Sequence, residues 1–209
     1  MTDLQPTVFV IDNDASLRHA LKTLIRSMGL NVELFASPQE FLQLRRPGVP
    51  SCLVLDVRLP GMSGLELQRH LIDANIPIPV IFITAHADIP MSVRAMKAGA
   101  IEFLTKPFRD QELLDSIQIA LEQDRTRLLR EKELAELRKR LESLTRRERE
   151  VIDMVVDGMP NKAIAAQIGI TENTVKAHRS RAMEKMQARS LPDLLKMVQK
   201  IAIPLEKSS

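Results

Sequence analysis

The sequence has one cysteine, no tryptophan and no tyrosine among its 209 residues. A single cysteine, Cys52, excludes an internal disulfide and a zinc site built from several cysteines. Because Cys52 lies in an apolar run, we expect a buried core thiol rather than a nucleophile. Six phenylalanines supply the only large aromatic side chains, which argues against a base-stacking surface for single-stranded nucleic acid.

Long apolar segments are missing as well. The N-terminus lacks a basic region followed by an apolar stretch, so no signal peptide is expected. No apolar run reaches the roughly 18 residues that a membrane-spanning helix needs. We therefore expect a cytoplasmic protein with no membrane partner.

The net charge of +3 is unevenly distributed along the chain. Residues 1–110 contain 11 basic and 11 acidic residues, and residues 111–143 contain 7 and 8. Residues 144–209 contain 12 basic residues against 8 acidic ones, a net charge of +4. A basic end on a neutral body favours an acidic partner, such as nucleic acid, for that end alone.

Residues 1–110 alternate between short apolar runs and segments with helical spacing. The expected strands are 7–11, 31–35, 52–55, 79–83 and 101–104. The expected helices are 17–28, 38–44, 65–71 and 89–98. This alternation predicts a doubly wound α/β fold, a flavodoxin-like five-stranded parallel sheet with helices on both faces.

Polar residues follow these strands where each one ends. Asp12 and Asn13 follow the first strand, Asp56 the third, Thr84 the fourth and Lys106 the fifth. Because parallel strands end at one edge of their sheet, we expect these side chains to meet. Clustered carboxylates favour a hard cation such as Mg²⁺ or Mn²⁺. The cation and Lys106 could hold a phosphoryl group while Asp56 attacks its phosphorus, and Thr84 could bond the new phosphoryl oxygen.

Each of these residues also has an ordinary explanation when it is taken alone. An aspartate at a helix start is usually an N-cap, and strand-end threonines and surface lysines are common. Only their joint placement at the strand ends of one sheet favours a phosphoryl site. His86 lies in a loop beside this edge, and a solvated side chain is expected there.

The segments VIDNDASLR, LVLDVRLPGMSG, VIFITAHADIP and MKAGAIEFLTKPF resemble the receiver domain of two-component response regulators over residues 5–125. The resemblance implies that Asp56 is the phosphoacceptor. It further implies a switch pair, Thr84 and Phe103, and a site lysine, Lys106, with a cis peptide bond to Pro107.

The same resemblance implies a metal site. Its ligands would be Asp12, Asn13, Asp56 and the backbone carbonyl of Arg58. The family usually has two acids after the first strand, and Asn13 stands in place of the second. An amide oxygen can coordinate Mg²⁺ but carries no charge, so we expect weaker metal binding and slower phosphorylation than is usual in the family.

Residues 111–144 contain no glycine and no proline, and their leucines and isoleucines recur at helical spacings. The pattern predicts that the last receiver helix continues into a charged helical linker over residues 124–143. Two interpretations remain open. The linker could pair two chains as a coiled coil, or it could be a solvated connector stabilised by local charge pairs.

Residues 144–209 predict a helix-turn-helix domain. Thr145 and Glu148 form a capping box, Asn161 is expected to cap a short helix, and Gly169 makes a tight turn before Thr171 caps the next helix. Two helices joined by a short turn, the second basic on its outer side, are typical of this fold.

The segments LTRREREVI, GMPNKAIAAQIGITENTVKAHRSRAMEKM and RSLPDLL resemble the LuxR-type, or GerE-type, four-helix DNA-binding domain. The resemblance implies that residues 172–186 enter the major groove of double-stranded promoter DNA, and that the last helix pairs two chains on DNA. The residues expected at base edges are Asn173, Lys176, Ala177 and Ser180. Those expected at phosphates are Lys162, Thr174, Arg179, Arg181 and Lys185.

A receiver at 1–123 joined to this domain at 144–209 identifies a member of the NarL/FixJ family of response regulators. The segments ADIPMSVRAMKAGAIEFL and LPDLL resemble its FixJ-type branch, which includes regulators of styrene and other aromatic-hydrocarbon catabolism. The resemblance implies a transcription factor and not an enzyme. A sensor histidine kinase would phosphorylate Asp56, and receivers would pair through residues 89–98 and 101–104. The dimer would then bind promoter DNA and activate RNA polymerase.

The same residues allow two alternatives to this interpretation. The first is a DNA-binding regulator that works without phosphorylation, because Asn13 replaces a usual metal-ligand acid. The second is a phosphatase with an aspartyl nucleophile. Such enzymes usually need an aspartate two residues after the nucleophile, and Arg58 at that position argues against it.

Overall fold

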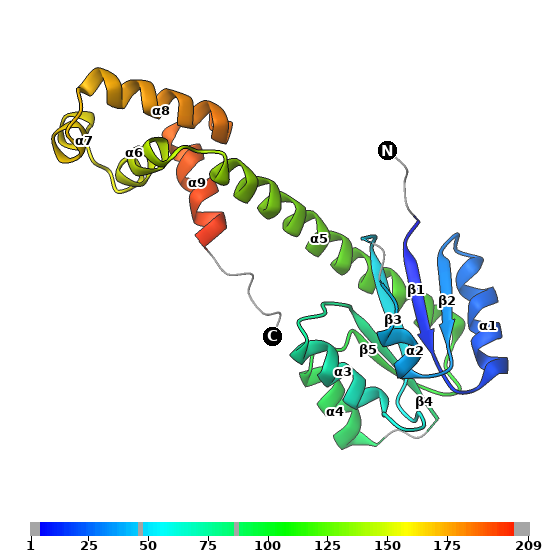
Figure 1. Cartoon of the computed structure of the whole chain (residues 1–209). Coiled ribbons are helices and arrows are strands. Elements are labelled where there is room, and N and C mark those ends of the chain that lie inside the picture. Colours follow the sequence, from blue (N-terminus) through cyan, green and yellow to red (C-terminus); the bar gives the residue numbers. More distant parts are fainter. Residues whose placement is uncertain (1–4, 46–47, 86–87, 203–209) are drawn as a thin grey trace. The chain divides into compact units, whose positions relative to one another are not determined.

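The computed structural model describes residues 5–45, 48–85 and 88–202 (Figure 1). Its first part is built on a parallel sheet of five strands in the order β2-β1-β3-β4-β5. The strands are β1 (Thr7–Ile11), β2 (Asn31–Phe35), β3 (Ser51–Asp56), β4 (Val80–Thr84) and β5 (Glu102–Thr105). This confirms the predicted doubly wound fold, because helices lie against both faces of the sheet.

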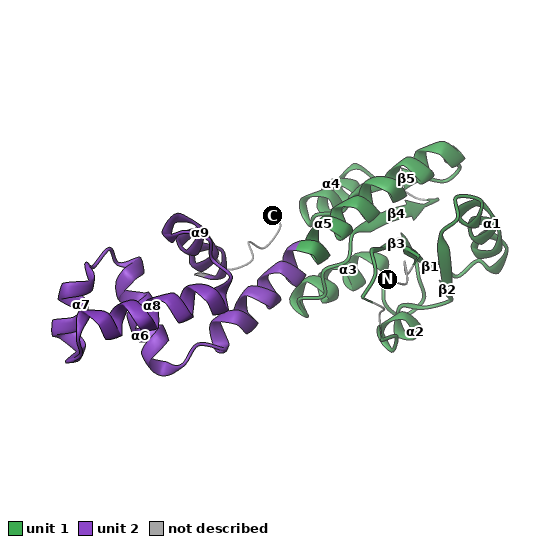
Figure 2. Cartoon of the chain, turned by 90° about the horizontal axis from the view of Figure 1, so that it is seen from above, with its two compact units in different colours: residues 1–129, 208–209 green, residues 130–207 purple. Residues whose placement is uncertain are grey.

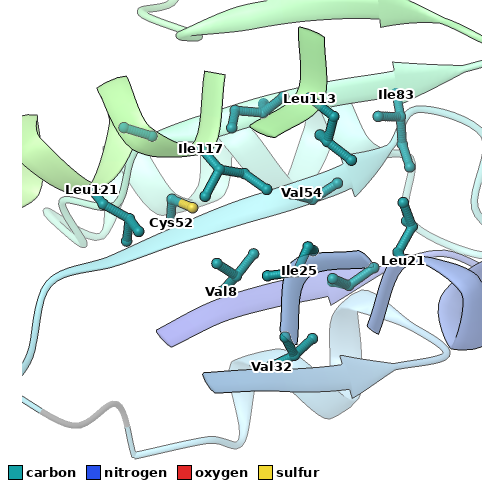
Figure 3. Packing of buried hydrophobic residues seen from close by; sticks show 13 residues of the cluster. Val8, Leu21, Ile25, Val32, Cys52, Val54, Ile83, Leu113, Ile117 and Leu121 are labelled. Carbon is teal, nitrogen blue, oxygen red and sulfur yellow. The ribbon is translucent and has the colours of Figure 1, made fainter. Parts of the chain in front are cut away.

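The helices divide between the two faces of the sheet according to the residues that they bury. The helices are α1 (Ala15–Arg26), α2 (Pro38–Leu42), α3 (Gly64–Asp73), α4 (Ile89–Lys97) and α5 (Asp110–Glu142). On one face α1 and α5 pack Ile25 and Ile117 against Val8 and Val54 of the sheet (Figure 3). On the other face α2, α3 and α4 cover a second cluster of buried residues around Phe9 and Phe82.

Strands β3, β4 and β5 each end one residue later than the sequence predicted, whereas β1 and β2 end where predicted. Asp56 and Thr84 were expected just after their strands, but they are the last residues of β3 and β4. The reason is that the ladder continues past them, since the Val57 amide donates to the Ile83 carbonyl at 3.3 Å and the Lys106 amide to the Thr84 carbonyl at 2.8 Å. Both polar side chains are therefore held by strand geometry rather than by a loop.

Helix α5 has 33 residues and passes from the first compact unit, which ends at Leu129, into a second that begins at Arg130 (Figure 2). The division falls inside the segment predicted as a linker, residues 124–143. Asp124 is buried in the first unit, where its Oδ2 accepts a hydrogen bond from the Ser51 amide at 2.8 Å. Arg127 pairs with its Oδ1 at 2.7 Å.

The second unit is helical. Its elements after α5 are α6 (Arg146–Val156), α7 (Asn161–Ile168), α8 (Glu172–Met186) and α9 (Leu191–Ala202). The capping box of Thr145 and Glu148 is present at the start of α6, and the side chain of Thr171 caps α8. Between α7 and α8, Gly169 has φ +70°, the left-handed conformation that glycine adopts without strain.

The prediction that Asn161 caps α7 is wrong. The cap is Pro160, and Asn161 is the first helical residue. The Pro160 carbonyl accepts hydrogen bonds from the amides of Ala163 and Ile164 at 2.9 and 3.1 Å. A proline has no amide hydrogen, so it precedes a helix without leaving a donor unpaired.

Two small cores hold the second unit together. Ile152, Met186 and Leu194 belong to one, and Val151 and Val175 belong to the other. Over the ranges that the structure describes, no helix has the length and apolar character that crossing a membrane requires.

Candidate functional site

The strand order brings the predicted polar residues together at one edge of the sheet. Asp12 directly follows β1, Asp56 ends the neighbouring β3, and Lys106 directly follows β5. The Lys106 Nζ lies 2.6 Å from Asp12 Oδ2 and 3.2 Å from Asp56 Oδ2. One ammonium group therefore bridges two carboxylates that are 44 residues apart in the sequence.

Asp12 is fixed by its surroundings. Its residue surface is completely buried, and its Oδ1 accepts a hydrogen bond from the Asp14 amide at 2.8 Å. The Arg18 Nη1 donates to the Asp12 backbone carbonyl at 2.6 Å. This carboxylate therefore has a defined orientation toward Lys106.

Asp56 is buried, and its Oδ1 accepts a hydrogen bond from the Arg58 amide at 3.2 Å. Burial raises the pKa of the Asp56 carboxyl above its ordinary value, while the charge of Lys106 and the Arg58 amide oppose that rise. The Asp56 carboxylate is therefore partly removed from water and has one neighbouring cation, Lys106.

The turn after Asp56 depends on Gly64, a requirement that the sequence analysis did not identify. The Gly64 amide donates to the Val57 carbonyl at 2.9 Å, and a Cβ at this position would lie 2.3 Å from the Asp56 carbonyl oxygen. Only glycine allows α3 to begin this close to the end of β3. A glycine directly after the N-cap Ser63 was the available signal.

Thr84 and Phe103 occupy the neighbouring strands. Thr84 is completely buried, and its carbonyl accepts the Lys106 amide. Phe103 on β5 is half-buried, with its ring 5.9 Å from that of Phe82. The peptide bond between Lys106 and Pro107 is cis, as the resemblance implied. His86 lies outside the described residues.

The oxygen donors at this edge suit a hard divalent cation, but with only two carboxylates. Asn13 is exposed, and Asp14 is already used as the N-cap of α1, accepting from the amides of Ser16 and Leu17. Within the described ranges, no three Asp, Glu, His or Cys side chains converge on one point. Lys106 joins two carboxylates at this edge, Asp12 and Asp56, and the neutral Asn13 follows Asp12 in the sequence.

The second candidate surface is the outer side of α8. On its inner side Val175, Ala182 and Met186 are buried. The four residues predicted to contact base edges are all exposed, and they are Asn173, Lys176, Ala177 and Ser180. Helical spacing places them on the side opposite the core, as groove reading requires.

The residues predicted to contact phosphates differ in their environments. Lys162 and Arg181 are exposed, and Arg179 is half-buried. The Thr174 hydroxyl lies 2.8 Å from the hydroxyl of the cap residue Thr171. All four residues therefore remain candidates for contacts with the phosphate backbone of DNA.

Lys185 instead forms an internal ion pair. Its Nζ lies 2.7 Å from Glu148 Oε2 and donates to the Ser143 carbonyl at 3.3 Å. The hydrogen bond from Lys185 and that from the Thr145 amide lower the pKa of Glu148 to about 2. Because Glu148 already balances its charge, Lys185 is less available for a phosphate than the sequence suggested.

Comparison with known proteins gives the same two parts. Residues 8–118 match the response regulator receiver domain, and residues 142–198 match the bacterial regulatory proteins of the luxR family. Nodulation protein W of Bradyrhizobium diazoefficiens is 53% identical over 94% of this chain and 86% of its own. The chain belongs to the LuxR-type response regulators.

Further relatives place this response regulator near the FixJ branch. The transcriptional regulatory protein FixJ of Rhizobium meliloti is 41% identical over 94% of this chain and 96% of its own. The low-resolution structure of the response regulator StyR has a TM-score of 0.86 at 50% identity, covering 94% of this chain and 99% of that one. These matches confirm the predicted family and the predicted function in transcription regulation.

Proposed function

We propose that Asp56 is the phosphoacceptor of this response regulator and that a sensor histidine kinase is its phosphodonor. The observation that carries the proposal is the position of Lys106 Nζ, within 3.2 Å of both Asp12 and Asp56. A cation at that point balances the negative charge that arrives with a phosphoryl group.

The proposed reaction uses side chains at this edge of the sheet. An Asp56 carboxylate oxygen attacks the phosphorus of a phosphohistidine, the bond between phosphorus and nitrogen breaks, and the phosphoryl group ends on Asp56. Lys106 exchanges its contact with Asp56 for one with a phosphoryl oxygen. The Thr84 hydroxyl then bonds another phosphoryl oxygen, and Phe103 changes its position with it.

We propose that Asp12, Asn13, Asp56 and the Arg58 backbone carbonyl hold Mg²⁺ or Mn²⁺. When it is bound, the ion supplies positive charge to the phosphoryl oxygens. The neutral amide of Asn13 makes this site weaker than one with three carboxylates, since each added carboxylate strengthens a hard-cation site.

The proposed output is a DNA-bound dimer. Ile89, Val93 and Met96 follow one another at helical spacing on α4 and are 79%, 43% and 43% exposed. Apolar exposure on one helix face favours the predicted pairing of receivers through α4 and β5. Two helices α8 would then read a two-fold promoter site, and the bound dimer would activate transcription by RNA polymerase.

Phosphorylation and DNA binding can be measured in one experiment. The full chain is treated with acetyl phosphate and Mg²⁺, the phosphorylated residue is identified by mass spectrometry, and binding to genomic fragments is followed by footprinting. We expect label on Asp56, none in Asp56→Ala, and stronger footprints after phosphorylation. Absence of label in the unmodified protein would refute the proposal.

Because Asn13 replaces a usual metal-ligand acid, a second candidate function is a regulator that binds DNA without phosphorylation. Lys106 already balances part of the charge of Asp12 and Asp56, so the fold does not need a metal to hold these carboxylates. This candidate requires equal footprints with and without acetyl phosphate, whereas the first requires a difference.

A further inference from the structure

A hollow of about 640 Å³ between α3 and α4 is lined by three arginines. They are Arg58 from the loop after β3, Arg69 from α3 and Arg94 from α4. The two helices are neighbours on one face of the sheet (Figure 1), where the Gln68 Nε2 donates to α4 at the Ala95 carbonyl at 3.3 Å. The arginines therefore come from three segments that the receiver fold brings together.

The three guanidinium groups are exposed, and none of them forms an ion pair with another residue in the described ranges. Arg94 Nε donates only to the Pro90 carbonyl of its own helix, at 3.3 Å. Glu66, the acid in the lining, is bound at 2.8 Å by both the amide and the hydroxyl of Ser63. Three arginines and one acid give the lining of the hollow a net positive charge. Residues 1–110 as a whole have no net charge.

The hollow is lined in part by the two residues that directly follow Asp56, although Asp56 itself is not in the lining. Its lining begins at Val57, the residue after Asp56. The Arg58 amide also holds Asp56 Oδ1, at 3.2 Å. Positive charge around a concave surface raises the local concentration of anions and the rate at which they arrive. An anion drawn to this hollow is therefore concentrated next to the loop that follows Asp56, whose Arg58 amide holds the Asp56 carboxylate.

We propose that Arg58, Arg69 and Arg94 attract small acyl phosphates and so accelerate kinase-independent phosphorylation of Asp56. The proposal rests on the role of Asp56 as phosphoacceptor. An Asp56 oxygen attacks the phosphorus, the bond between phosphorus and the acyl oxygen breaks, and the acyl group leaves as a carboxylate with the electron pair. Atoms and charge balance without a further reactant.

The test compares phosphorylation rates of the full chain with acetyl phosphate as the probe. We expect Arg69→Gln/Arg94→Gln to lower the second-order rate constant about three- to tenfold at low ionic strength, at or below the lower end of the range for electrostatic steering, because only two of the three charges are removed. In salt of about 0.5 M the rates should converge, because screening acts over only a few ångströms there. Arg69→Lys/Arg94→Lys keeps the charge and should restore most of the rate.

A matched control removes two cations from the opposite face of the sheet. Lys22→Gln/Arg26→Gln lies on α1, which packs in the other core cluster, and should leave the rate unchanged. Equal rates for the two glutamine variants at low ionic strength would overturn the inference. So would a loss that persists in high salt, since it would indicate altered structure rather than lost charge. Failure of the unmodified protein to label at all would instead refute the role of Asp56.

Discussion

The pair of Glu148 and Lys185 offers a direct test of what stabilises the DNA-binding unit. The Glu148 side chain is only 4% exposed, and it accepts hydrogen bonds from Lys185 Nζ at 2.7 Å and from the Thr145 amide at 2.9 Å. We expect Glu148→Gln to destabilise this unit, because the neutral amide removes the ion pair and weakens the capping box of α6.

The size of the effect follows from the pKa of Glu148, which these contacts lower from 4.5 to about 2. A shift of that size corresponds to at most about 3 kcal/mol of folding free energy. The Lys185 side chain is 37% exposed, so solvent screening should reduce the measured loss to about 1–2 kcal/mol. Because the pKa is lower in the folded state, this stabilisation is present above pH 4.5 and is lost as the pH falls toward 2.

The measurement needs a probe other than fluorescence, because the chain has no tryptophan or tyrosine. Hydrogen exchange of α6 and α8 peptides in the full chain reports their opening free energies at neutral and acid pH. Glu150→Gln is the matched control, since Glu150 is in the same helix but pairs with exposed Arg146 and Arg147. Equal protection of the two variants at neutral pH, or a difference that acid does not diminish, would refute the reasoning.

Three further predictions concern the receiver. Gly64→Ala places a Cβ 2.3 Å from the Asp56 carbonyl, so we expect a loss of about 1–3 kcal/mol in thermal unfolding, with slower acetyl phosphate labelling; wild-type behaviour in both would contradict this. Asn13→Asp adds a third carboxylate and should tighten Mg²⁺ binding in a metal titration. Equal affinities would show that the neutral Asn13 does not weaken the metal site. Asp124→Ala leaves the buried Ser51 amide without its 2.8 Å acceptor and should lower the free energy of unfolding by about 2–4 kcal/mol. Urea unfolding followed by circular dichroism measures this, and an unchanged midpoint would show that this hydrogen bond does not stabilise the receiver.

Much of the receiver could be predicted from local sequence patterns. Hydrophobic periodicity identified five strands and the helices between them, because burial on both faces of a parallel sheet requires continuous apolar runs such as Cys52–Leu55. The parallel topology then required that Asp12, Asp56 and Lys106 meet at one edge. Family resemblance supplied their roles, which the spacing alone did not.

Local sequence patterns could not predict contacts between distant segments. Nothing local to Lys185 indicates that Glu148, 37 residues earlier, balances its charge. The same holds for Asp124, which was predicted as the first residue of the helical linker but is buried against the Ser51 amide.

The sequence by itself determined which elements form, where the proposed phosphoacceptor Asp56 lies along the chain, and which side of α8 is polar. Only the tertiary structure decided how the charged groups are used. It joined Arg58, Arg69 and Arg94 around one hollow, and it placed the start of α3 so close to Asp56 that only glycine fits at position 64. The physical reason is that periodicity depends on neighbours along the chain, whereas charge pairing and close packing depend on residues that meet only after folding.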